Sequence, residues 1–239
     1  MPLFKRKEID FSSIEKMTVE KNSVALMWFN KYSGTIIKSP NVEIVIDPVD
    51  ISPKGIEVLN PHIIVISHEH YDHFDKKIVM QLQKDKAVII GPSHVIRELK
   101  GSISDEFLKE IHAGEETEIN RFKIIAQKAD HPSPEPLTFV FITEDGITIY
   151  HAIDSRTFDD MKSIGEKYKP DIAIVPIGIA PGTSPEEGAR AISLLNPKVA
   201  IPHHATKGFE KFMEITKKLV PHVSIKLLET GEIFTYKRE

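Results

Sequence analysis

Short runs rich in β-branched and aromatic residues recur along the chain between turn residues, and such runs predict strands. The expected strands cover residues 24–29, 35–37, 42–47, 63–67, 87–90, 122–127, 137–142, 147–150, 172–175, 198–201, 224–228 and 233–236. The expected helices cover residues 76–83, 94–99, 157–168, 185–195 and 207–219. The early half is mostly strand and the later half alternates strand with helix, a mixture that suits packed sheets covered by helices.

Local signals support several of these boundaries. Asp75 is suited to cap the first helix, and Ser184 with Glu187 forms a capping box at the start of the fourth. Asp145-Gly146 lies between two β-rich runs and predicts a tight hairpin turn. The chain has neither a low-complexity linker nor a repeat of short period. We therefore expect one domain over residues 1–239.

Composition is that of a soluble globular protein, with 41% hydrophobic and 28% charged residues. No apolar run approaches the roughly 20 residues of a membrane span. The basic residues Lys5, Arg6 and Lys7 are not followed by the apolar segment of a secretory signal. We therefore expect a cytoplasmic protein that does not cross a membrane. The sequence does not indicate its oligomeric state.

The absence of cysteine from the sequence limits the available chemistry. It excludes disulfides, thiolate ligands and cysteine nucleophiles, so any metal must be held by nitrogen and oxygen atoms. The formal net charge of −4 lacks the positive excess typical of proteins that bind duplex nucleic acid, and it disfavours a polyanionic partner. A small-molecule substrate is therefore the expected partner.

The densest chemistry of the chain is the segment Ser-His-Glu-His-Tyr-Asp-His-Phe-Asp at 67–75, directly after an apolar run. Side chains alternate along an extended segment, so His68 and His70 point to the same side and can share one metal ion. Asp72 and His73 follow as the chain turns, and they can face a second ion nearby. A polar surface loop is the alternative, but such loops are built mainly from Gly, Pro, Asn and Ser. This segment consists almost entirely of metal ligands, so we predict a metal site.

Three further sets of ligands follow expected strands: His131, Asp154, and the pair His203 and His204. Taken singly, each has a simpler explanation: His131 could be a turn histidine, Asp154 could cap a helix, and the histidine pair could be a solvated strand end. Together they recur at strand ends in a chain that already contains a dense ligand cluster. We therefore interpret them as the remainder of a two-metal site.

The segment 61–73 resembles the HxHxDH signature of the metallo-β-lactamase superfamily. Other segments are similar to one branch of that superfamily, the metal-dependent hydrolases related to L-ascorbate 6-phosphate lactonase. These segments are Trp28 and residues 44–48, 150–155, 175–178, 184–187 and 201–204, in the order that the branch has them. The resemblance extends from about residue 24 to about residue 206.

The resemblance implies an α/β fold of the αββα type, a four-layer metallo-β-lactamase-like sandwich with metals at one edge between two mixed sheets. It also implies a ligand set for two ions: His68, His70 and His131 for the first, Asp72, His73 and His204 for the second, and Asp154 bridging both. Asp72 and Asp154 are the expected catalytic carboxylates. Asp47 either orients a ligating imidazole or only begins a turn.

Three departures from the branch limit what can be carried over. Phe29 and Asn30 follow the tryptophan where the branch has Gly-His, and Ile153 stands where it has glycine before the aspartate. Ala205 replaces a tyrosine that would contact substrate. Lactonase activity is therefore not inferred.

The ligand set itself indicates a reaction type. Two divalent cations about 3.5–4 Å apart can share a hydroxide and supply it as a nucleophile at neutral pH. Zn is the first expectation for imidazole and carboxylate ligands, with Mn and Fe as alternatives. Asp154 or a metal-coordinated water would protonate the leaving group, and His203 is a weaker candidate. The leading hypothesis is a dinuclear metal-dependent hydrolase of a small ester, lactone or phosphoester.

Other functions of the same ligand set remain open at this point. A phosphodiesterase or nuclease of the same fold is one alternative, and a metal-binding protein without turnover is another. A thiolester hydrolase of the glyoxalase II kind ranks lower, because residues 207–239 leave no room for the additional helical domain that it would need.

Arg156 lies two residues beyond Asp154, near the expected start of a helix at 157. A guanidinium beside helix N-terminal amides would form an anion-binding corner and favour an anionic substrate. The alternative is a surface arginine that pairs with Asp159 or Asp160.

Overall fold

The computed structural model describes residues 9–84 and 86–238, which form two seven-stranded sheets. The first sheet has the strand order β14 (Ile233–Lys237), β1 (Ser23–Trp28), β2 (Thr35–Lys38), β3 (Glu43–Ile46), β4 (Ile63–Val65), β5 (Val88–Gly91) and β6 (Leu108–Glu110). The second has the order β13 (Ser224–Ile225), β12 (Val199–His203), β11 (Ile172–Pro176), β10 (Thr148–His151), β9 (Leu137–Ile142), β8 (Phe122–Lys128) and β7 (Glu116–Ile119).

Both sheets are mixed. Strands β14, β1, β2 and β3 pair antiparallel, whereas β3 to β6 pair parallel. In the second sheet β7 to β10 pair antiparallel and β10 to β13 pair parallel. Parallel neighbours end at the same edge of a sheet, so the loops after them gather there.

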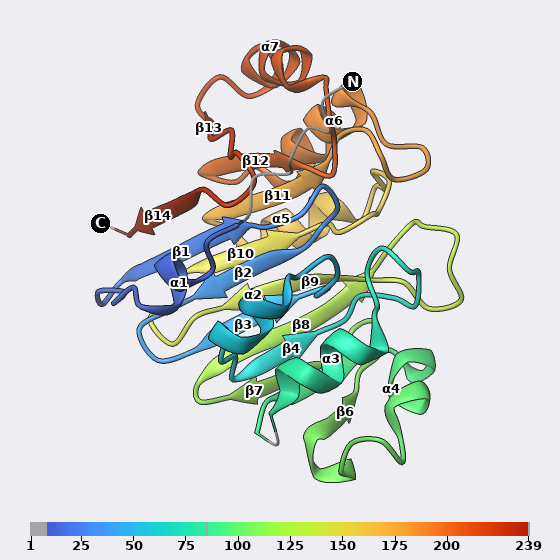
Figure 1. The fold of residues 1–239 in the computed structure, drawn as a ribbon. Helices are drawn as coiled ribbons and strands as arrows, with labels where there is room; N and C mark the ends of the chain where they lie inside the picture. The colour runs from blue at the N-terminus through green and yellow to red at the C-terminus, as the bar shows by residue number, and fades with distance from the viewer. Residues whose placement is uncertain (1–8, 85, 239) are drawn as a thin grey trace, which may run out of the picture.

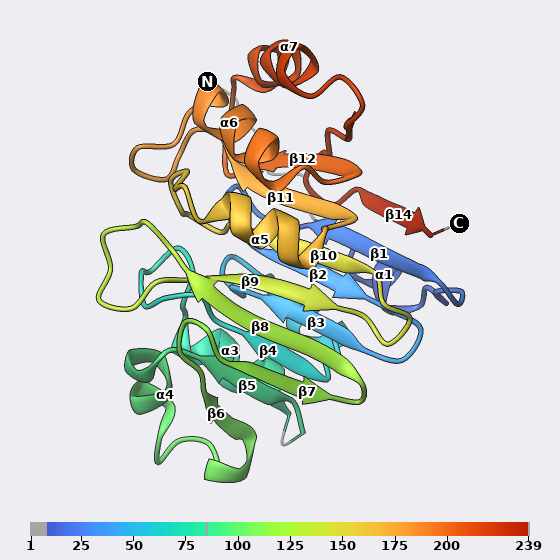
Figure 2. The ribbon, with the colours of Figure 1, turned by 180° about the vertical axis from the view of Figure 1, so that it is seen from behind.

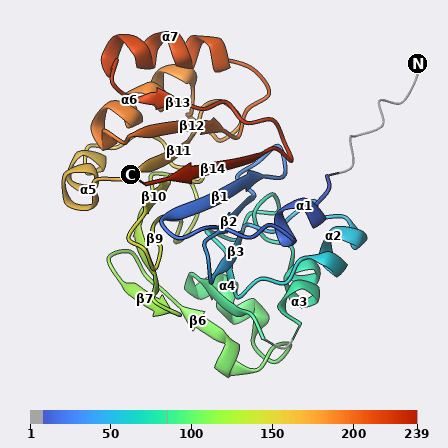
Figure 3. The same ribbon diagram turned by 90° about the vertical axis from the view of Figure 1, so that its left-hand side faces the viewer.

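Helices cover the two outer faces of the sandwich. The first half of the chain contributes α1 (Ser12–Glu15), α2 (Pro53–Val58), α3 (Lys76–Gln83), α4 (Ser93–Leu99) and the 3-10 helix η1 (Asp105–Phe107). The second half contributes α5 (Met161–Tyr168), α6 (Pro185–Leu195) and α7 (Phe209–Leu219). In the edge-on view of Figure 3, α2 and α3 lie on one side of the paired sheets, with α5 and α6 on the other. The predicted αββα fold is therefore confirmed.

The alternation of side chains explains how one strand serves two cores. In β3, Ile44 and Ile46 are fully buried between the two sheets, whereas Val45 packs under the helices of the first half. Because both faces are covered, the strand is apolar throughout instead of alternating with polar residues. None of the helices in the described part of the chain has the length and apolar character that crossing a membrane requires.

Several predicted boundaries are confirmed. The Asp75 side chain accepts hydrogen bonds from the backbone N–H groups of Lys77 and Ile78 and caps α3, and the Ser184 hydroxyl accepts one from Glu187 N at the start of α6. Gly146 has a φ of 84° in the turn between β9 and β10, a conformation that glycine adopts without steric cost.

Other boundaries were wrong. The helix expected from residue 157 begins at Met161, because the Thr157 hydroxyl donates to Glu187 O and holds this stretch in a non-helical turn. The strand expected over 224–228 ends at Ile225. Strands β6 and β7 and helices α1 and α2 lacked a recognised sequence signal; they are short, and their stability comes from packing instead of local propensity.

Candidate metal centre

The predicted ligands lie on loops that meet at one edge of the sandwich. His68 follows β4, His131 follows β8, Asp154 follows β10, and His204 directly follows β12. In Figure 1 the loops after β8 and β11 project on the right-hand side, and Figure 2 shows them from behind on the left. The two facing sheets therefore bring together ligands that are far apart in the sequence.

The first group of side chains consists of His68, His70 and His131, whose ligand atoms lie within 4.8 Å of one another. His70 Nδ1 is 3.1 Å from His68 Nε2 and 3.1 Å from His131 Nε2. In a tetrahedral zinc site with bonds of 2.0–2.1 Å, two ligand nitrogens are about 3.3 Å apart. The three rings therefore have the spacing of ligands around one small cation.

The second group consists of Asp72, His73, Asp154 and His204. His73 Nε2 lies 3.1 Å from Asp154 Oδ2, and His204 Nδ1 lies 2.7 Å from Asp154 Oδ1. Asp154 Oδ2 is also 4.0 Å from His131 Nε2, an atom of the first group. Asp154 is therefore the residue that lies between the two groups.

Buried polar atoms of the second group lack hydrogen-bond partners among the described residues. They include His73 Nε2, Asp154 Oδ1 and both ring nitrogens of His204. The close contacts to Asp154 are thus ion-pair distances without the direction of a hydrogen bond. Leaving such atoms unpaired costs about 1–3 kcal/mol each, and coordination to a divalent cation would satisfy them. The residues fit a metal site.

A buried carboxylate behind the two groups orients one histidine of each. Asp47 Oδ2 accepts hydrogen bonds from His73 Nδ1 at 2.8 Å and from the Ser67 hydroxyl at 2.8 Å. The Ser67 oxygen in turn lies 2.9 Å from His68 Nδ1. Ser33 donates to Asp47 Oδ2 as well, at 2.7 Å. Since the Nδ1 atoms are engaged in this way, the Nε2 atoms of His68 and His73 are left facing the site.

The electrostatics of the site favour cations. Burial would lower the pKa of His73, but the carboxylates of Asp154 and Asp47 outweigh it and raise the pKa to about 10. Burial would raise the pKa of Asp154, but the charge on His73 and the contact with His204 hold it well below its usual range. The two carboxylates that favour a positive charge at His73 would also stabilise a divalent cation, which would displace the proton from His73 Nε2 on binding.

The pKa of His68 is shifted in the opposite direction, downward. Burial and then the neighbouring charge on His73 lower the pKa of His68 far below its ordinary value, and burial also lowers the pKa of His131. Both rings are therefore neutral at physiological pH. A neutral imidazole has a free lone pair, which is the form that binds metals.

His203 lies outside both groups, unlike its neighbour His204. It is 1% exposed, and its ring meets that of His151 edge-on with centroids 4.9 Å apart. Burial first, and His151 second, hold the pKa of His203 well below its ordinary value. A buried neutral ring that belongs to neither ligand group is not placed to protonate a leaving group, so the structure does not favour the general-acid role considered for it.

Arg156 has a different partner from those expected. Its Nη2 lies 2.7 Å from Asp130 Oδ1, whereas Asp159 pairs with Arg190. Its backbone N–H also donates to Asp130 O at 3.0 Å. Because α5 begins only at Met161, Arg156 is not beside helix N-terminal amides. The residue connects the loop that carries His131 to the loop that carries Asp154.

Sequence reasoning missed the supporting serines. Ser67 is adjacent to His68 in the sequence, which was the available signal for its role. Ser33 is 40 residues away from His73, which its hydroxyl contacts at 2.9 Å, and nothing in the sequence indicated that contact. Asp47, for which two interpretations were open, accepts these hydrogen bonds and also begins the turn through Val49 N.

Comparison with known proteins supports the assignment of the fold. Residues 25–204 match the model of the β-lactamase superfamily domain. A UPF0173 metal-dependent hydrolase of Saccharolobus solfataricus is 32% identical over 192 residues, covering 75% of this chain and 83% of that protein. One from Methanobrevibacter smithii is 31% identical over 238 residues, covering 90% and 98%. The structure of a metallo hydrolase from Ignicoccus hospitalis superposes with a TM-score of 0.80 at 22% identity, covering 91% of this chain and 100% of that one.

The superfamily prediction is thus confirmed, while the relation to the ascorbate lactonase branch stays a prediction. The family match covers every ligand-bearing loop, from the segment after β4 to His204. The chain belongs to the β-lactamase superfamily, among its UPF0173 metal-dependent hydrolases.

Proposed function

We propose that this protein hydrolyses a small ester, lactone or phosphoester with two divalent ions at the edge of the sandwich. In this proposal His68, His70 and His131 hold one ion, Asp72, His73 and His204 hold the second, and Asp154 contacts both. The observation that carries the proposal is the arrangement of the ligand atoms in two groups with Asp154 between them. Zinc is the first expectation for this imidazole and carboxylate set, with manganese and iron as alternatives.

When bound, the ions would lower the pKa of water toward about 7, supply it as a hydroxide nucleophile and polarise the bond under attack. The protein residues provide the direction of approach. The side chain of His70 is 37% exposed and that of Asp72 is 17% exposed, whereas those of His73 and His204 are fully buried. Substrate therefore reaches the site from the side of His70 and Asp72.

The two carboxylates suit different tasks. The strongly lowered pKa of Asp154 makes it a poor proton carrier and a good partner for cations. Asp72 is the solvent-facing carboxylate of the second group, so it is the residue placed to pass a proton to the leaving group. In this division Asp154 positions the site and Asp72 acts at the substrate.

The adjacent pair His203 and His204 provides a matched test. We expect the wild-type protein to bind two ions per chain by elemental analysis, His204→Ala to lose one ion and its hydrolytic activity, and His203→Ala to retain both ions. Circular dichroism would check that each variant is folded. At most one tightly held ion in the wild type, with zinc, manganese and iron offered in turn, would exclude the two-metal proposal.

Activity is tested on a panel of lactones, carboxylic esters, phosphomonoesters and phosphodiesters with metal-loaded protein. The expected result is turnover of at least one class that is lost in His204→Ala. Turnover restricted to phosphodiesters would favour the phosphodiesterase alternative. Absence of turnover across the panel, with both ions bound, would favour a metal-binding protein.

A further inference from the structure

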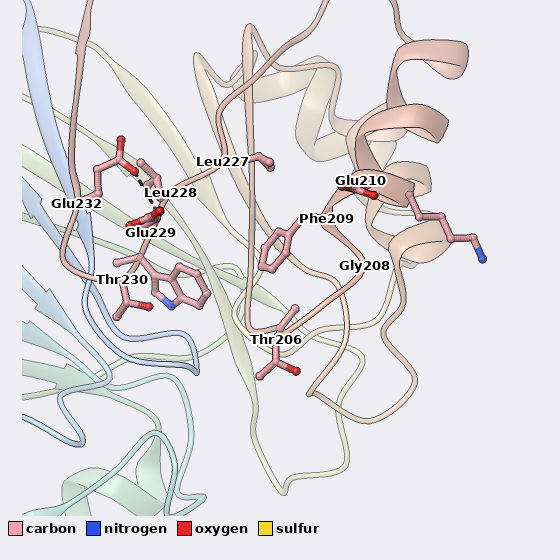
Figure 4. A pocket seen from close by; sticks show the side chains of 12 residues that line it. Thr206, Gly208, Phe209, Glu210, Leu227, Leu228, Glu229, Thr230 and Glu232 are labelled. Carbon is pink, nitrogen blue, oxygen red and sulfur yellow. Dashed lines mark hydrogen bonds between the residues drawn. The ribbon is translucent and has the colours of Figure 1, made fainter. Parts of the chain in front are cut away.

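An open groove of about 940 Å³ lies beside the metal centre, between the start of α7, the segment before β14 and the end of β1. This volume is within the range of about 300–1,000 Å³ that is typical of small-molecule sites. Figure 4 shows Phe209, at the start of α7, and Leu228 on opposite sides of the groove. None of the metal-ligand candidates lines it.

The inner end of the groove adjoins the second ligand group. Ala205, which lines the groove, is bonded to His204 in the chain. Trp28, also in the lining, donates a hydrogen bond from Nε1 to Tyr32 O at 2.7 Å, and the ring of Tyr32 lies edge-on to that of His204 with centroids 5.6 Å apart. A ligand in the groove would therefore extend away from the site where hydrolysis is proposed.

The floor of the groove is apolar and well shielded. Trp28 is 6% exposed, Ala205 is 5% exposed and Leu228 is 6% exposed, while Phe209 and Leu227 are half-buried. Removing an apolar chain from water against such a surface is favourable by about 0.8 kcal/mol per methylene. Ala205 has a short side chain, so a larger residue at this position would project into the groove.

The rim carries excess negative charge. Lys211 pairs with Glu186, and Glu232 pairs with Lys226 at 2.6 Å, so these lining residues are neutralised. The carboxylates of Glu210 and Glu229 have no basic partner at ion-pair distance in the described part of the chain. Both residues are exposed. A rim of this kind repels a carboxylate or phosphate at the far end of a bound molecule.

We infer that this groove binds an uncharged aliphatic acyl or alkyl chain of the substrate, so that the enzyme acts on amphipathic esters or lactones whose chain ends without an anionic group. The inference rests on the proposed hydrolytic function, because it assigns the chain to the same substrate. Its physical basis is the buried apolar floor, the excess of carboxylates at the rim, and the position of the lining residue Ala205 directly after His204 in the chain.

Trp28 makes the groove directly observable, because it is the single tryptophan of the sequence and lies in the floor. Its fluorescence would be followed during titration with 1-decanol, decyltrimethylammonium, decanoate and 1-butanol, each below the concentration at which it forms micelles. We expect saturable changes with 1-decanol and decyltrimethylammonium, binding of decanoate weaker by about tenfold or more, and no saturable change with 1-butanol. Equal binding of decanoate, or no saturable change with any decyl probe, would overturn the inference.

Variants separate the groove from other apolar surfaces. Ala205→Phe, which fills the inner end, and Phe209→Ala, which removes a wall, should each weaken 1-decanol binding by about tenfold or more. Leu219→Ala is the matched control, because Leu219 is on the same helix, is 52% exposed and does not line the groove. Glu210→Gln combined with Glu229→Gln should bring decanoate binding to within about threefold of 1-decanol binding. Equal loss in Leu219→Ala would refute the assignment.

Kinetics connect the groove to turnover. With metal-loaded protein, kcat/KM for p-nitrophenyl esters should rise with acyl length from two to ten carbons, and Ala205→Phe should abolish that rise. Probe binding should persist after chelation of the metal. Ester hydrolysis without a decyl-probe response would refute the inference alone, whereas probe binding without hydrolysis of any ester, lactone or phosphoester would refute the proposed function.

Sedimentation showing a dimer that Phe209→Ala dissociates would show that a second copy covers the groove and would also overturn the inference.

Discussion

Asp47→Asn is the substitution that tests most directly whether the buried network behind the ligands controls metal binding. The Asp47 carboxylate is fully buried and accepts hydrogen bonds from His73 Nδ1, from the hydroxyls of Ser33 and Ser67, and from Ser67 N. Three of these donors share Oδ2, and the fourth uses Oδ1. The carboxylate is thus an acceptor on both oxygens.

An asparagine cannot satisfy all four donors. If its oxygen takes the place of Oδ2, its amide hydrogens face Ser67 N–H, which donates to Oδ1 at 2.8 Å in the wild type. The variant loses a hydrogen bond to a charged acceptor and leaves a buried donor unpaired, so we expect unfolding free energy to fall by about 2–4 kcal/mol. His73 loses its charged partner, and loss of such a supporting contact weakens metal affinity by about 10–100-fold, or about 1.4–2.8 kcal/mol.

Asp171→Asn is the matched control. Asp171 is 1% exposed and accepts from Thr148 N at 3.0 Å and from the hydroxyl of Tyr236 at 3.1 Å, but it precedes β11 at the edge opposite the ligands. Both variants should lose stability in urea unfolding of the metal-free protein. Only Asp47→Asn should weaken binding of the second ion in a chelator competition titration. Equal metal affinity in the two variants would refute the role of Asp47 in positioning the ligands.

Three further substitutions test separate features. Burial raises the pKa of Glu43 to about 7, so between about pH 4.5 and 7 the folded state binds more protons than the unfolded state and the free energy of unfolding falls as pH rises. The loss is on the order of 2–3 kcal/mol. Glu43→Gln should remove it, as measured by urea unfolding at pH 5 and pH 8. Arg156→Ala breaks the pair with Asp130 and should alter KM equally for anionic and neutral substrates, whereas an effect confined to anionic substrates would show that Arg156 binds substrate. A Cβ at Gly165 would lie 2.6 Å from Leu195 O, so Gly165→Ala should separate α5 from α6 and lower the melting temperature, at a cost of about 1–3 kcal/mol.

The sequence was most informative where function concentrates ligands in a short segment. Alternation of side chains along an extended segment predicts that His68 and His70 lie on one side, and their ring nitrogens are 3.1 Å apart. The assembly of Asp154 with these residues depends on two sheets that face each other, and no local propensity encodes that contact. The resemblance to a known family predicted this assembly, because the order of its motifs reflects a fold that the local propensities of single segments do not specify.

The groove illustrates what sequence patterns cannot reach. Its floor combines Trp28 with Leu228, and these two residues come together because β14 pairs with β1 in the register Met27 to Ile233. Residues 233–236 were predicted as a strand, but a strand prediction does not name its partner. A cavity between the end of one strand and the segment before another therefore becomes visible only when the pairing is known.

Backbone strain at the strand ends explains how the ligands point back into the sandwich. Asp47, Ile153 and His204 have φ angles of 47°, 54° and 51°, in a left-handed region that costs a non-glycine residue about 1–3 kcal/mol. For the β-branched Ile153 the conformation is a genuine outlier, and it persists because its side chain, 1% exposed, is fixed in the core between the sheets. Asp47 accepts the hydrogen bond from His73, Ile153 directly precedes Asp154, and His204 is itself a ligand candidate. The strain is located where the chain must reverse within one residue, so the packing of the core holds the metal centre in its geometry.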